Sequence, residues 1–266
     1  MNIRRAISSA IYVSSGAIGV LAFIYPFFLD AQPTGSLGVA HGHDATLVTT
    51  ALVGLSLVAL LVELQGQTIS AKTVALLGVM VAITSVLRFI EVAVPMPGGF
   101  SPIFAPIILS GYVFGGRFGF LMGAFTMLAS ALVTGGVGPW LPYQMFTTAW
   151  VGMTAGWLGK IPRSKFGAWD LGGLAVLGFA WGLLYGVIIN VYFWPFAAGT
   201  SEQAWSPGAG LGETLARYGA FYAATSLGWD LVRAGGNVAL ILLLGRPVVR
   251  ALARFQRRFH FEVADA

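Results

Sequence analysis

Two charged residues within an apolar stretch are the first candidates for chemistry in this chain. Arg88 and Glu91 are three residues apart, so a helix would place both side chains on one face. Charged groups inside hydrocarbon are costly, and those that persist usually face a cavity, a partner or each other. The spacing leaves two interpretations open, a contact with a ligand and an internal ion pair that serves helix packing.

A second polar group lies near the C-terminus. Asp230, Arg233 and Asn237 follow i, i+3, i+7 spacing, which lines one stripe of a helix. Such a stripe inside a membrane is typical of a hydrogen-bonded seam between helices or of a path for protons or ions.

Aromatic and amide side chains form two further clusters. The segment 134–144 reads TGGVGPWLPYQ, in which glycines and prolines shape a connector, and a second cluster follows near residue 190. Aromatic rings offer stacking surfaces and amides offer hydrogen bonds to a ligand, although Trp and Tyr are also ordinary at membrane interfaces. The candidates are Trp140, Tyr143, Gln144, Asn190, Tyr192 and Trp194.

Several kinds of chemistry are disfavoured. The chain has no cysteine, and its glycine-rich segments are not followed by the Lys-Ser or Lys-Thr of a phosphate-binding loop. His41, His43 and Asp44 are too weak a pattern to predict a metal site. We therefore expect no metal, no cofactor and no enzymatic activity.

The composition predicts the elements that must position these residues. The chain is 57% hydrophobic and only 9% charged, against about 25% charged residues in a typical soluble domain. Its long, continuous apolar runs predict an all-α membrane bundle of about eight transmembrane helices rather than a barrel of alternating strands. The expected spans are 5–29, 45–64, 70–94, 102–116, 117–135, 142–160, 171–194 and 217–245.

The basic residues predict how these spans are oriented. Nearly all Lys and Arg residues fall in breaks on one side, which the positive-inside rule assigns to the cytoplasm together with both termini. The net charge of +5 is explained by this orientation in a cell membrane, so nucleic acid is not an expected partner. We expect a two-helix N-terminal extension at 1–66, a six-helix core at 67–246 and a basic amphipathic cytoplasmic tail at 247–266.

Three motifs carry a resemblance to a known family. They are Leu87-Arg88, the run SGYVFGGRFGFLMGAF at 110–125, and TGGVGPWLPYQMFTTAWVGMTAGWLG at 134–159. From residue 70 onward the chain resembles the S components, the substrate-binding membrane subunits, of energy-coupling factor (ECF) vitamin transporters. Within that family it looks most like the cobalamin-type branch.

The resemblance implies a function and partners. An S component of this kind binds a vitamin or cofactor precursor, here cobalamin or a related corrinoid, at the outer face of the membrane. It docks with a transmembrane coupling subunit and two ATPase subunits, which supply the energy for uptake. In the family, small residues on the first core helix contact the coupling subunit, and the matching residues are Ala71, Ala75, Gly78 and Ala82.

The expected ligand contacts combine this resemblance with the residues discussed above. They are Arg88, Glu91, Trp140, Tyr143, Gln144, Asn190, Tyr192 and Trp194. The alternative function is a stand-alone ion- or proton-coupled secondary transporter, for which the stripe of Asp230, Arg233 and Asn237 is the motivation.

Overall fold

The computed structural model describes residues 3–24, 27, 51, 54, 71–94, 97–138, 140–161, 166–197 and 200–259. Within these ranges the chain is helical and contains no strand, which confirms the predicted all-α fold. The expected second span, 45–64, lies outside the described residues except for 51 and 54. The helices are α1 (Ile3–Ile24), α4 (Ala71–Ala93), α5 (Phe104–Phe114), α6 (Gly116–Thr134), α7 (Leu141–Leu158), α8 (Ala168–Phe193), α9 (Leu211–Thr225) and α10 (Leu227–Phe259), with short 3-10 turns η2 (Pro97–Gly99) and η3 (Trp194–Phe196).

The exterior of the bundle is apolar, as a lipid environment requires. Three stretches, Lys72–Ala93, Gly116–Thr134 and Ala168–Phe196, are long and apolar enough to cross a membrane by length and composition. Large apolar side chains such as Leu132 and Val176 point outward and are exposed. Because few polar groups interrupt this surface, hydrocarbon rather than water is its natural surrounding.

Helix α5 lies at the centre of the bundle and is short. Its 11 residues rise about 17 Å, roughly half of the ~30 Å hydrocarbon thickness. Ile107 and Ile108 are fully buried, and α6, α7 and α10 pack around the helix. Gly115, with φ of 93°, ends it in a conformation that favours glycine, so that α6 begins at once.

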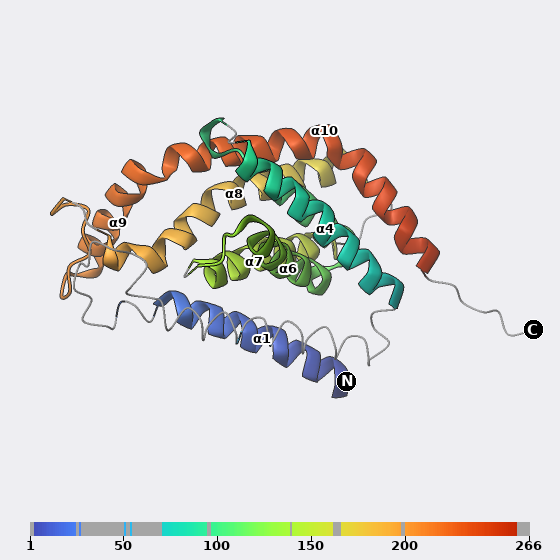
Figure 1. Ribbon diagram of the computed structural model, residues 1–266, viewed down its shortest axis with the longest axis horizontal. Coiled ribbons are helices and arrows are strands. Elements are labelled where there is room, and N and C mark those ends of the chain that lie inside the picture. The colour runs from blue at the N-terminus through green and yellow to red at the C-terminus, as the bar shows by residue number, and fades with distance from the viewer. Residues whose placement is uncertain are drawn as a thin grey trace, which may run out of the picture.

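Helices α6 and α7 are held together by very close backbone contact. A Cβ atom on Gly119 would lie 2.2 Å from the carbonyl oxygen of Gly152, and one on Gly152 would lie 2.1 Å from that of Gly119. Gly123 faces the Thr148 carbonyl in the same way. Small residues allow helices in lipid to approach closely enough for extensive van der Waals contact. Figure 1 shows α6 and α7 in the middle of the molecule, with α4, α8, α10 and α1 around them.

The C-terminal region differs from the expected single span at 217–245. The chain forms α9, breaks at Ser226, and continues as α10, whose 33 residues run through Pro247 into the expected tail. Val249 and Leu252 are buried, and Gln256 Nε2 donates a hydrogen bond of 2.9 Å to the Val113 carbonyl. The part of the helix beyond residue 246 is therefore packed against the bundle and reaches the end of α5.

Helix α1 lies along one side of the core and contacts α7 and α8. The Tyr12 ring meets Phe120 edge-on with centroids 5.3 Å apart, and Phe23 meets Tyr143 at 5.0 Å. The first helix of the N-terminal region therefore packs on the surface of α6 and α7 through aromatic side chains.

The close α6–α7 contact leads to a first prediction. Gly119→Ala should destabilise the protein by about 1–3 kcal/mol, because its new methyl group cannot fit beside the Gly152 carbonyl. Thermal unfolding in detergent measures the effect. The matched control is Gly78→Ala, since nothing lies within 4 Å of a Cβ at Gly78. Equal melting temperatures for the two variants would contradict the packing described here.

Candidate functional site

A polar pocket of about 300 Å³ opens among the helices at the end of the bundle where α10 begins. Its walls come from α4, α5, α6, α7, α8 and α10, together with the residues that precede α5 and α10. The lining residues are Arg88, Glu91, Ser101, Ile103, Phe104, Met127, Gln144, Tyr185, Gly186, Ile189, Asn190, Ser226, Trp229, Asp230 and Arg233.

One wall holds the Arg88–Glu91 ion pair on α4. Arg88 Nη1 donates to Glu91 Oε1, and Glu91 Oε2 accepts a hydrogen bond of 2.7 Å from Ser101 Oγ. The two side chains are 27% and 14% exposed, so they are largely enclosed while still reaching the pocket. The structure thus shows the internal ion pair, and it places both residues at a cavity where a contact with a ligand remains a prediction.

The opposite wall holds a second ion pair on α10. Arg233 Nη1 donates to Asp230 Oδ1, and the guanidinium lies 5.1 Å from the centroid of the Tyr185 ring, within the range of a cation–π contact. Asp230 is only 2% exposed. Gly186 makes room for it, because a Cβ there would lie 1.7 Å from Asp230 Oδ2.

The stripe on α10 is thus divided between two environments. Asp230 and Arg233 line the pocket, whereas Asn237 is fully buried. Asn237 Nδ2 donates a hydrogen bond of 2.9 Å to the Gly178 carbonyl on α8. Asn237 contributes to the α8–α10 seam. The two ion pairs, from helices far apart in the sequence, share one cavity.

Neutral polar groups complete the pocket. Asn190 Nδ2 on α8 donates a hydrogen bond of 2.6 Å to Ser226 Oγ, which links α8 to the break between α9 and α10. Gln144, on the first turn of α7, lines the pocket as well. No hydrogen bond of its side-chain amide occurs within the described part of the chain, so this amide remains able to bind a ligand.

The aromatic candidates lie outside the pocket lining. Trp140 Nε1 donates a hydrogen bond of 3.1 Å to the Gly136 carbonyl and stabilises the connector before α7. Tyr143 and Tyr192 stack with ring centroids 4.1 Å apart, joining α7 to α8. Trp194 Nε1 donates a hydrogen bond of 2.7 Å to the Gln203 carbonyl, and the Trp194 ring packs beside Tyr218 of α9. These rings join the elements around the pocket.

The small residues of α4 lie on a different surface. Ala75, Gly78 and Ala82 are exposed, and Ala71 begins the helix but its side chain lies outside the described part of the chain. Gly78 and Ala82 line an apolar groove of about 450 Å³ whose other wall is Ala129 and Val133 of α6.

Of the lining residues, only Arg88, Glu91, Gln144 and Asn190 were predicted from the sequence as ligand contacts. Ser101, Tyr185, Ser226 and Trp229 have types that are common at helix ends and interfaces, so nothing singles them out. A signal did exist for Asp230 and Arg233, because their i, i+3 spacing repeats that of Arg88 and Glu91.

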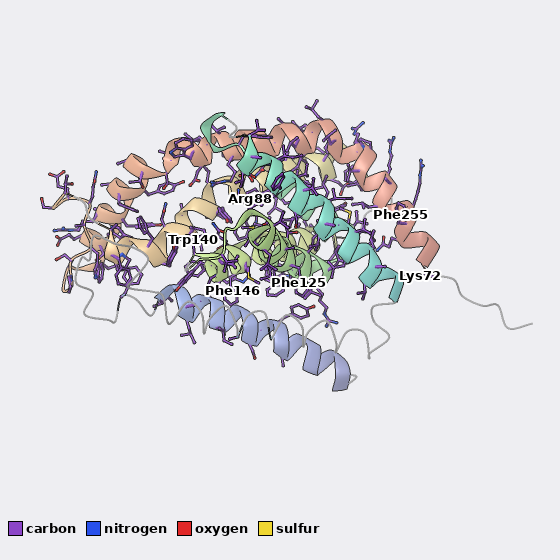
Figure 2. The ribbon with its side chains drawn as sticks, in the orientation of Figure 1. Lys72, Arg88, Phe125, Trp140, Phe146 and Phe255 are labelled. Carbon is purple, nitrogen blue, oxygen red and sulfur yellow. The ribbon has the colours of Figure 1, made fainter. Side chains whose placement is uncertain are left out.

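The pocket lies away from the basic end of the molecule. In Figure 2, Lys72 and Phe255 mark one end, and Arg88 lies toward the opposite end of α4. Close contacts of Gly159 with Tyr112 and of Gln256 with Val113 bring the ends of α5, α7 and α10 together at the basic end.

The structure thus combines apolar helices long enough to span a membrane with a pocket lined by two ion pairs and by apolar side chains. A family model described as "ECF transporter, substrate-specific component" matches residues 72–245, well over half of the chain. The chain therefore belongs to this family, as the sequence motifs predicted. A search of curated proteins found no match, and a search of solved structures found none either.

The second ion pair leads to a prediction about stability. Asp230→Ala should destabilise the protein by about 3 kcal/mol, because it leaves the Arg233 guanidinium enclosed without its counter-charge. The double variant Asp230→Ala/Arg233→Met should recover to within about 1 kcal/mol of the wild type. Thermal unfolding in detergent tests both variants. If the double variant were the less stable of the two, the pairing argument would fail.

Proposed function

We propose that this chain captures a vitamin or cofactor precursor at the outer face of the membrane and delivers it inward with energy from partner subunits. The observation that supports this most directly is the enclosed pocket with two ion pairs and free polar groups. Polar side chains inside an apolar bundle cost free energy, so those that occur there are expected to serve binding or transport.

The orientation follows from the distribution of charge. The exposed basic residues Lys72, Lys160, Arg250 and Arg254 lie at or near helix ends remote from the pocket, on α4, after α7 and on α10. The positive-inside rule then assigns this end, and both chain termini, to the cytoplasm. The pocket accordingly faces the exterior.

The energy source is expected to be external to the chain. The sequence has no phosphate-binding loop, and an S component works with a transmembrane coupling subunit and two ATPases. The exposed surface of Ala75, Gly78 and Ala82, with Ala71 at its start, is the proposed contact with the coupling subunit. Its groove suits a partner helix, since small residues let backbones approach.

The stand-alone carrier remains the alternative function. The stripe on α10 motivated it, but Asp230 is paired with Arg233 and Asn237 is bonded to Gly178. This arrangement favours a static pocket and a helix seam over a continuous ion path.

Reconstitution in liposomes separates the two functions. We expect accumulation of a radiolabelled vitamin only when the chain is combined with a coupling subunit, two ATPases and ATP, because the chain has no means of its own to use ATP. Uptake by the chain alone under a proton or sodium gradient would favour the carrier. The control is the same liposome without this chain.

A bulky residue on the proposed coupling surface should separate binding from uptake. Ala82→Trp should leave ligand affinity within about twofold and abolish ATP-driven uptake, because the indole would fill the apolar groove. Calorimetry and liposome uptake give the two readouts. Val176→Trp, on the exposed face of α8, is the matched control and should retain both activities. Normal uptake by Ala82→Trp would contradict this assignment.

A further inference from the structure

We propose that the ligand is a compact molecule with a single carboxylate, and that Arg88 and Arg233 bind this carboxylate. The inference rests on the proposed function of the pocket, and it narrows the substrate from vitamins in general to one chemical class. Three properties of the pocket support it, namely its hydrogen-bond donors, its charge and its size.

The two guanidinium groups of the pocket have unused hydrogen-bond donors, whereas both carboxylates that line it are ion-paired. Both carboxylate oxygens of Glu91 are already engaged, by Arg88 and by Ser101. Each guanidinium carries five N–H donors, yet the hydrogen bonds of Arg88 and Arg233 within the described part of the chain use only Nη1. The remaining N–H groups are suited to a planar two-oxygen acceptor, the geometry in which Arg binds carboxylates.

The charge balance disfavours a ligand with two or more charges of one sign. Two arginines and two carboxylates line the pocket, and these four formal charges cancel. A ligand with two negative charges would meet no net positive charge to offset them. A cation would need a carboxylate without a counter-charge, but Glu91 is paired with Arg88 and Asp230 with Arg233. One carboxylate can be bound by the spare arginine donors.

The size of the pocket favours a compact ligand. Its volume of about 300 Å³ lies at the lower end of the ~300–1,000 Å³ range of small-molecule sites. Ile103, Phe104, Ile189 and Trp229 add apolar surface for the body of the ligand. A corrinoid, with its macrocycle and peripheral amide arms, requires a much larger cavity, so the pocket suits a smaller molecule.

The test compares acids with neutral analogues of nearly the same shape. Calorimetry on the full chain in detergent would use nicotinate and nicotinamide, pantothenate and panthenol, and biotin and biotin amide, with thiamine as a cation and cobinamide as a corrinoid. We expect at least one acid to bind and its neutral analogue to bind at least about tenfold more weakly, because the amide or alcohol lacks the second charged oxygen.

A matched pair of variants tests the role of arginine. Arg88→Lys keeps the positive charge beside Glu91 but loses the fork of parallel donors, so the affinity for the acid should fall at least about tenfold. Arg217→Lys on α9, where Arg217 pairs with Glu213 outside the pocket lining, should leave affinity unchanged. Equal affinity in both variants would overturn the assignment of Arg88.

The outcomes distinguish this inference from the function on which it rests. Equal binding of an acid and its neutral analogue, or binding of thiamine or cobinamide without any acid, would overturn the inference and leave vitamin capture intact. No binding across the whole panel would overturn the proposed function together with the inference.

Discussion

The cost of an uncompensated charge in a low-dielectric environment is the constraint on which the site depends. Arg88 and Arg233 each have a carboxylate one helical turn away, at the i, i+3 position of the same helix. Because each ion pair forms within one helix, each arginine is compensated without a partner from another helix. The pairs can therefore line a cavity and need not link the helices of the bundle. The surrounding structure then adapts to them, as Gly186 does for Asp230 and Ser101 does for Glu91.

The space for the pocket comes from the short central helix. Because α5 begins only at Phe104 and rises about 17 Å, it fills the middle and the basic end of the bundle but not the opposite end. Ile103 and Phe104 therefore form part of the pocket lining. Around α5, glycines bring α6 to α7 and α8 to α10, where a Cβ on Gly182 would lie 2.3 Å from the backbone of Ala234. Such contacts let the helices pack closely through van der Waals interactions, in addition to the few hydrogen bonds between them.

The sequence predicted those features that depend on local spacing. Apolar length indicated the helices, and three-residue spacing placed Arg88 beside Glu91. It did not predict that Asp230 and Arg233 would enter the same cavity, because that depends on how α4 and α10 pack across the bundle. The break at Ser226 was also missed, since no proline marks it and Gly228 lies inside the helix that follows. The sequence also did not predict that Tyr143 and Tyr192 would stack on each other across α7 and α8, and their contact with a ligand remains a prediction.

A pocket of paired charges suits a protein that must bind and then release its ligand. If Arg88 and Arg233 were unpaired, the empty site would hold two costly charges, and loss of the ligand would be strongly opposed. Because Glu91 and Asp230 already compensate them, the empty pocket is stable, and the ligand contributes through the spare N–H donors and the apolar lining. The ligand can then bind tightly through the arginine N–H donors and the apolar lining. Its release requires only that these donors move away from the lining on the other side of the pocket. Helix α10 is well placed for such a movement, because it carries Asp230 and Arg233 at one end and contacts α5 through Gln256 at the other. Because α10 is one continuous helix, a rigid displacement at its basic end would move the wall of the pocket that carries Asp230 and Arg233.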